Sequence, residues 1–153
     1  MAARFSSGVE SFVQAREYSL PAFDQASQLE RVRGDEMPHE GDSTTRDISR
    51  GVVAIYKDYM GRGPTDAHTE LTETSAVTTV SGSLTKAEHS LVADGKAELV
   101  RDMRRTFQDA MRQEIVDLVE TATGREAGSF LSDHDTGSDI AVEMVLFKAP
   151  AAS

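Results

Sequence analysis

The longest regular pattern in the sequence is a run of apolar residues, three or four apart, that extends over residues 96–122. Such spacing puts side chains on one face of an α-helix, and about 27 helical residues make a rod of about 40 Å. Gly124 follows at a position where a left-handed residue commonly ends a helix. The residues of this stripe are Leu99, Met103, Phe107, Ala110, Met111, Ile115, Leu118, Val119 and Ala122.

A helix of this length is expected to extend beyond a small four-stranded sheet. Part of its apolar stripe would then have no sheet to pack against within the same chain. We therefore predict a homodimer, formed through the long helix or through an open edge of the sheet.

A second helical pattern comes before a short glycine-rich motif. Its apolar residues recur at intervals of four, three and four, which puts them on one helix face: Ile48, Val52, Ile55 and Tyr59. We expect the helix to begin at Thr44 or Thr45, because Thr44 and Asp47 resemble a capping pair. The motif that follows is Tyr59-Met60-Gly61-Arg62-Gly63-Pro64, whose glycines free the backbone and whose proline stops the helix.

Strand-like segments flank the long helix on both sides. Residues 67–74 and 76–81 are rich in Thr and Val, whereas residues 128–133 and 139–148 form a second hairpin, whose last segment is apolar enough to be central. Thr85 and Glu88 form a capping box that starts a short helix. The predicted order, α-β-β-α-α-β-β, is an α+β fold: a two-layer α/β sandwich with a mainly antiparallel four-stranded sheet and helices on one face.

This arrangement predicts the limits of the domain and its core. We expect the domain to comprise residues 44–148, with residues 149–153 frayed. Residues 1–43 are predicted to be a flexible acidic tail with transient short helices, and the alternative is an arm that docks on a partner through Phe5, Phe12 and Phe23. The side chains expected to be buried are Ile55, Tyr59, Leu99, Met103, Phe107, Ile115, Leu118, Val142, Met144 and Leu146.

Charge and composition exclude several classes of partner. The chain has 16 Lys and Arg against 26 Asp and Glu, a net charge of −10. Nucleic acid and anionic membrane surfaces both require a basic protein surface, so we expect neither as a partner. The chain has no cysteine, no run of about 18 apolar residues and no apolar core of a secretory signal at its start. We expect a soluble, cytoplasmic protein that does not insert into a membrane.

Gly61, Arg62 and Gly63 are the best candidates for ligand binding. Glycine amides can approach a ligand without obstruction from a Cβ atom, and the Arg62 guanidinium is a permanent planar donor for bicarbonate or a phosphate group. Phosphate loops usually precede a helix, however, whereas this loop follows one. The alternative is that the loop only ends the helix and that Arg62 pairs with a nearby carboxylate.

The other polar residues give weaker indications of chemistry. Arg62, His68 and Glu70 are the best constellation for an enzyme, with His68 and Glu70 as an acid-base pair on one strand face. No nucleophile, metal cage or cofactor loop accompanies them, so we assign no catalytic residue and no cofactor. The segment from Asp133 resembles a calcium loop, but Met144 replaces its bidentate glutamate, and a solvated hairpin turn is expected instead of a metal site.

The motifs together resemble those of the MpsC family. The residues that carry the resemblance are Tyr59, Met60, Gly61, Arg62, Gly63, Pro64, Leu84, Thr85 and Glu88. The resemblance implies a link to a membrane-potential-generating system and to inorganic-carbon uptake, in which separate membrane proteins carry out the transport. It therefore implies a non-enzymatic accessory or regulatory protein with a membrane transporter as partner. The alternative is a domain or enzyme that binds a small anion or metabolite near Arg62, His68 and Glu70.

Overall fold

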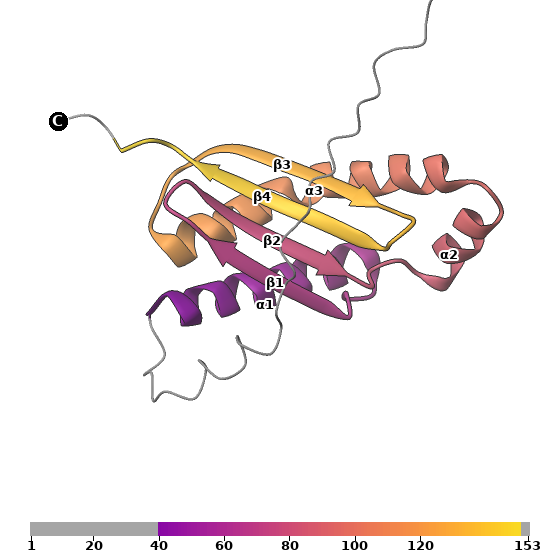
Figure 1. Cartoon of the computed structure of the whole chain (residues 1–153), viewed down its shortest axis with the longest axis horizontal. Coiled ribbons are helices and arrows are strands. Elements are labelled where there is room, and N and C mark those ends of the chain that lie inside the picture. Colours follow the sequence, from indigo (N-terminus) through magenta and orange to yellow (C-terminus); the bar gives the residue numbers. More distant parts are fainter. Residues whose placement is uncertain (1–39, 151–153) are drawn as a thin grey trace, which may run out of the picture. The chain divides into compact units, whose positions relative to one another are not determined.

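The computed structural model describes residues 40–150, which form three helices and four strands in the predicted order (Figure 1). The elements are α1 (Glu40–Met60), β1 (Asp66–Leu71), β2 (Ser75–Ser81), α2 (Lys86–Ala93), α3 (Ala97–Thr123), β3 (Ala127–Asp135) and β4 (Ile140–Phe147). The predicted α+β fold is therefore confirmed. Residues 1–39 and 151–153, with most of the predicted tail and its three phenylalanines, lie outside the described residues.

The strand β4 is central in the sheet, as its apolar sequence predicted. The strands lie in the order β1-β2-β4-β3, and every neighbouring pair is antiparallel. β2 and β4 come from different hairpins and pair from Ser75 with Leu146 to Ser81 with Ile140. This pairing joins the two hairpins into one sheet, whose edges are β1 and β3.

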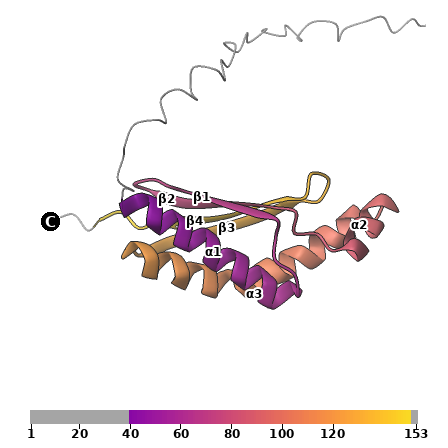
Figure 2. The same ribbon diagram turned by 90° about the horizontal axis from the view of Figure 1, so that it is seen from below.

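The core lies between the sheet and the helices α1 and α3, which cover the same face of the sheet (Figure 2). Burial of apolar side chains in this core contributes most of the favourable free energy of folding, because each fully buried Val, Ile or Met side chain is worth about 1.5–3 kcal/mol. Gly51 lets α1 approach α3 closely, since a Cβ atom there would overlap the Leu118 side chain. The buried apolar residues are Ile48, Val52, Ile55, Tyr56, Ala76, Val80, Met111, Ile115, Val119, Ala141 and Val145.

The helices α2 and α3 begin and end as the sequence predicted. Thr85 and Glu88 form the capping box at the start of α2. The helix α3 contains 27 residues and ends at Gly124, which has a left-handed φ of 67°. Figure 1 shows that α2 and the start of α3 extend past the end of the sheet. None of the described helices is long and apolar enough to cross a membrane.

The helix α1 begins at Glu40, four residues before the predicted start at Thr44. Thr44 therefore lies inside the helix and is not its cap. Residues 40–43 lie in the segment that the sequence predicts as part of an acidic tail, and Gly41 within it is a poor helix former. A glycine costs only about 1 kcal/mol in a helix, however, and burial of Ile48 and Val52 anchors a helix of 21 residues strongly enough to include it.

The face of β4 that packs against the helices is the opposite of the predicted one. Ala141, Glu143 and Val145 face the helices and are fully buried. The predicted core residues Val142, Met144 and Leu146 are only half-buried and alternate with them on the other face. We call that face, which neither α1 nor α3 covers, the open face (Figure 1).

The buried stripe of α3 is also rotated from the predicted one. Leu99 and Met103 were predicted to be buried, but their side chains are 58% and 38% exposed. The stripe that faces the core is Val100, Arg104, Gln108, Met111, Ile115 and Val119. Of the other predicted core residues, Ile55 and Ile115 are buried, and Tyr59, Phe107 and Leu118 pack half-buried against the core.

Candidate functional site

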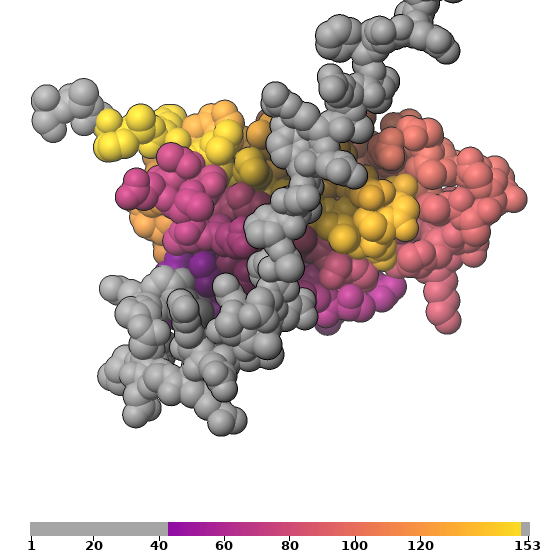
Figure 3. Space-filling view, viewed as in Figure 1, coloured from indigo at the N-terminus to yellow at the C-terminus, as the bar shows by residue number. Residues whose placement is uncertain are grey.

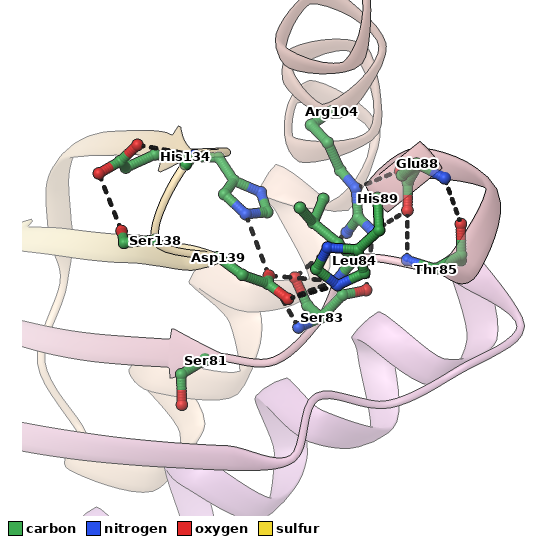
Figure 4. Close-up of polar contacts among 12 residues, drawn as sticks. Ser81, Ser83, Leu84, Thr85, Glu88, His89, Arg104, His134, Ser138 and Asp139 are labelled. Carbon is green, nitrogen blue, oxygen red and sulfur yellow. Dashed lines mark hydrogen bonds and ion pairs between the residues drawn. The ribbon is translucent and has the colours of Figure 1, made fainter. Parts of the chain in front are cut away.

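Arg104 connects three parts of the chain at the end of the sheet where α2 lies. Its side chain projects from α3 and is only 1% exposed. Nε and Nη2 donate to the two carboxylate oxygens of Glu88 on α2, at 2.6 and 2.5 Å. Nη2 also donates to the carbonyl oxygen of Ser83 at 2.7 Å (Figure 4). This bidentate pair fixes α2 on α3.

Glu88 is the carboxylate partner of Arg104 and also part of the helix cap. The Thr85 amide donates to Glu88 Oε2 at 2.7 Å, and the Glu88 amide donates to the Thr85 hydroxyl at 3.3 Å. Burial raises the pKa of Glu88, but hydrogen bonds from Arg104 and Thr85 and the charge of Arg104 outweigh it and lower the pKa overall. Glu88 is therefore held as an anion inside the protein.

The glycine-rich motif after α1 is attached to the same site through Arg62. Nη1 of Arg62 donates to the carbonyl oxygen of Leu84 at 2.7 Å. Met60 lies beside the buried guanidinium, with its sulfur 2.7 Å from Nη1 of Arg104. Arg62 and Arg104 thus bring the motif of residues 59–64 together with the motif residues Leu84, Thr85 and Glu88 at the start of α2.

Asp139 holds the loop before α2 from the other side. This residue has a left-handed φ of 52°, and its Oδ1 accepts the amides of Ser83 and Leu84 at 3.0 and 3.1 Å. Nε2 of His89 and Nε2 of His134 each lie 3.4 Å from an Asp139 carboxylate oxygen (Figure 4). Among the described residues, no group of three His, Asp or Glu side chains is placed to hold a metal ion.

His134 is a buried histidine whose pKa lies below its ordinary value. Burial, together with the positive charge of Arg104, lowers its pKa and outweighs the opposite effect of Asp139. A second buried cluster lies deeper, where the Tyr56 hydroxyl donates to Glu143 Oε1 at 2.6 Å and Gln108 donates to the same oxygen at 3.4 Å. Burial raises the pKa of Glu143 and outweighs the hydrogen bonds from Tyr56, Ser132 and Gln108, which lower it.

An apolar groove lies directly over the Arg104–Glu88 pair. It has a volume of about 350 Å³, and the end of α1, the start of α2 and the middle of α3 form its walls. Tyr59 is fixed at its rim, because its hydroxyl donates to Glu114 at 2.7 Å. We call it the motif groove; it is lined by Tyr59, Met60, Thr85, Ala87, Glu88, Leu91, Met103, Arg104 and Phe107.

The candidate site residues predicted from the sequence lie in different surroundings. Gly61 and Arg62 are exposed and Gly63 is half-buried, and Arg62 donates to the carbonyl oxygen of Leu84. His68 and Glu70 are exposed on the open face of β1, where they alternate with Thr69, which faces α1 and bonds Ser49. No contact joins Arg62 to His68 or Glu70 among the described residues.

Sequence reasoning missed Arg104, Asp139 and His134. The buried position of Arg104 could have been predicted, because the residue belongs to a line with the helical spacing of an apolar stripe. The members of this line are Val100, Arg104, Gln108, Met111 and Ile115. A charged residue within such a stripe indicates a buried partner of opposite charge. Asp139 and His134 gave no comparable signal, since Asp and Gly in a hairpin turn are explained by the turn itself.

Comparison with known proteins gives one match. The family model described as "Na+-translocating membrane potential-generating system (MpsC)" matches residues 41–149. No curated protein and no solved structure matches the chain. The matched region includes all described elements except the first residue of α1, and it contains the motif residues that meet at Arg104 and Arg62. The chain therefore belongs to the MpsC family.

Proposed function

We propose that the protein is a non-enzymatic accessory subunit of a membrane-potential-generating system and binds a protein partner through the motif groove. The observation that carries this proposal is that the charged motif residues make structural contacts within the chain. Glu88 pairs with Arg104, and Arg62 bonds a backbone carbonyl group. These contacts shape a groove whose accessible walls are Tyr59, Met60, Leu91, Met103 and Phe107. Apolar side chains of this kind recognise a surface; they do not transfer protons.

The ionisable pair under the groove is better suited to support than to catalysis. A general acid or base must change its protonation state near the working pH. The lowered pKa of Glu88 opposes protonation, and Arg104 is a permanent cation with little exposure. The pair therefore supports the position of α2, which forms one wall of the groove.

The partner that we propose is a membrane subunit of the same system. The description of the family names a Na⁺-translocating system, and translocation requires a protein that crosses the membrane. We propose that this chain binds the cytoplasmic side of that subunit and regulates its transport, with bicarbonate uptake as the process affected.

Capture of the membrane partner tests this function. The full chain is immobilised and exposed to detergent-solubilised membranes from its source cells, and bound proteins are identified by mass spectrometry. We expect the same integral membrane transporter in repeated captures and a loss of about tenfold or more with Met103→Glu, which places a charge in the groove. Gln113→Glu adds the same charge on α3 outside the groove and should leave capture unchanged. Equal capture by both variants would remove the groove from the proposal.

A second candidate function is binding of a small anion at Gly61, Arg62 and Gly63. The observation in its favour is that a Cβ atom placed on Gly61 would meet nothing within 4 Å, so the backbone there is open to a ligand. Calorimetric titration of bicarbonate and nucleotides into wild type and Arg62→Ala tests it. Heat that disappears in Arg62→Ala without a fall in melting temperature supports the site, and the absence of heat rejects it. Turnover of the bound ligand that is lost in His68→Ala would favour an enzyme.

A homodimer remains a separate proposal. The edge strand β3 is nine residues long and has an unpaired side, which supports pairing between two copies through an open edge. Light scattering on the full chain at micromolar concentration should then give twice the mass of 16.6 kDa. A constant monomer mass over this range would reject the dimer.

A further inference from the structure

We propose that the open face of the sheet is a second docking surface, and that it binds an amphipathic helix with basic residues along both sides of its apolar stripe. This surface lies on the side of the sheet opposite α1 and α3 and does not include the motif groove (Figure 2). The proposal therefore stands independently of the function proposed for that groove.

The centre of the open face is a line of apolar side chains along β4. Ile140, Val142, Met144 and Leu146 alternate outward with the buried residues of the strand. Leu131 on β3 and Val77 on β2 are the cross-strand partners of Met144 and widen the line in the middle. Figure 3 shows this side of the molecule in space-filling form, and atoms of β4, in yellow, reach the surface. An apolar strip on a sheet face is expected to be covered by another surface.

The most exposed large apolar residues of the open face are Leu131 on β3 and Ile140 at the start of β4. The side chain of Leu131 is 56% exposed and that of Ile140 is 41% exposed. A shallow groove of about 340 Å³ lies between β3 and β4 and is lined by Leu131, Ser132, Asp133, Val142 and Met144. One large apolar side chain of a partner would fill much of it.

Acidic residues border the apolar strip on both sides. On β1, Asp66 and Glu70 are exposed on either side of His68, and on β3, Asp133 and Asp135 are exposed. These two edge strands are three strand spacings apart, about 14 Å. An α-helix with its side chains is about 10–12 Å across. A helix lying along β4 would be one strand spacing from the β3 carboxylates and two spacings, about 10 Å, from those on β1, so long lysine or arginine side chains on its flanks would reach both rows.

The length of the strip also fits a helix. From Ile140 to Leu146 the strand rises about 20 Å, which corresponds to about 13 helical residues, or nearly four turns. Apolar side chains at every third or fourth position of such a helix would follow the line of β4. A second copy of the same face is disfavoured, because its acidic rows would lie against acidic rows, and an anionic membrane surface is disfavoured for the same reason.

The test uses the full chain and a pair of designed peptides. One is an 18-residue helical peptide with leucines on one face and lysines along both flanks; in the other, glutamates replace the lysines. Binding is measured by calorimetry for wild type and for two open-face variants, Met144→Glu and the charge variant Glu70→Gln/Asp133→Asn. Met103→Glu in the motif groove is the matched control, and circular dichroism checks that each variant is folded.

We expect the lysine peptide to bind at least tenfold more tightly than the glutamate peptide. Its affinity should fall severalfold when the NaCl concentration rises from about 50 to 300 mM. Met144→Glu should reduce its affinity about tenfold or more, the charge variant should reduce its salt dependence, and Met103→Glu should change neither. Equal binding of the two peptides would overturn the proposal, and so would the absence of binding, which would show that the face is already covered within the chain. A dimer that light scattering detects and that Met144→Glu breaks would also overturn it. Failure of membrane capture alone would leave this proposal unaffected.

Discussion

Arg104 occupies a position where a helix that faces a core usually carries an apolar side chain, and its contacts explain why it is tolerated. Removing it leaves the anion of Glu88 buried beside Ser83 without a cation. Loss of one member of a buried pair typically costs about 3–5 kcal/mol. We therefore expect Arg104→Met to lower the free energy of unfolding by about that amount, as measured by urea denaturation.

The exposed pair of Arg101 and Glu98 on the same helix is the control for this prediction. Arg101→Met should cost less than about 1 kcal/mol, because solvent screens an exposed ion pair. Arg104→Met/Glu88→Gln should recover part of the loss, since no unpaired charge is then left in the interior. Similar costs for the two single variants would contradict a structural role of Arg104.

The same residues show what single-residue reasoning can predict. The capping role of Thr85 and Glu88 was visible, because both partners are three positions apart in the sequence. The contact of Glu88 with Arg104, sixteen positions away, depends on how α2 packs on α3. Local spacing does not contain that information, so the site was only partly predicted although its motif residues were named.

At the scale of elements, the loop that joins β2 to α2 depends on Gly82. This residue has a φ of +67°, and a Cβ atom there would collide with the side chain of Thr65. A left-handed non-glycine residue costs about 1–3 kcal/mol before any collision is counted. We expect Gly82→Ala to destabilise the protein by more than this conformational cost alone, as shown by its midpoint of urea denaturation.

Gly61 provides the matched control for the loop. It has a similar φ of +70°, but a Cβ atom there would meet nothing within 4 Å. Gly61→Ala should therefore show only the same conformational cost of about 1–3 kcal/mol. If both alanine variants lose the same stability, the packing of Gly82 on Thr65 is not important.

The elements themselves were predicted more reliably than the faces that they bury. Capping residues and Gly124 mark helix ends chemically, so α2 and α3 were placed within one or two residues. The sequence of β4 is apolar at alternate positions on both faces, and only packing against α1 and α3 selects Ala141 and Val145 for the core. The stripe of α3 was misjudged because its apolar spacing pointed to the line of Leu99 and Met103, whereas the line one position further along the chain, with Val100 and Arg104, faces the core.

At the scale of the whole molecule, one layer of helices on one sheet leaves two different surfaces accessible. The motif groove lies among the three helices, and the open face lies on the other side of the sheet (Figure 2). The two docking surfaces that we propose are therefore separated by the sheet. The order of elements allowed the two layers to be predicted, but the location of both surfaces followed only from the packing.

The stability of the whole molecule is expected to depend on pH through two buried groups. Burial raises the pKa of Glu143 above its ordinary 4.5, so its contribution is fully present below pH 4.5 and is lost as the pH rises through the folded pKa. Burial lowers the pKa of His134 below its ordinary 6.5, so its contribution is present above pH 6.5 and is lost as the pH falls toward the folded pKa.

Two substitutions by the neutral residue glutamine should therefore change the pH dependence in opposite directions. Glu143→Gln removes the loss at rising pH, so this variant should gain stability relative to wild type as the pH increases above about 4.5. His134→Gln removes the loss at falling pH, so it should gain relative to wild type as the pH decreases below about 6.5. Each difference has a maximum slope of about 1.4 kcal/mol per pH unit, because one proton is involved. Urea denaturation of the three proteins at a series of pH values measures both slopes, and difference curves that stay flat would show that neither group is buried in the way the structure places it.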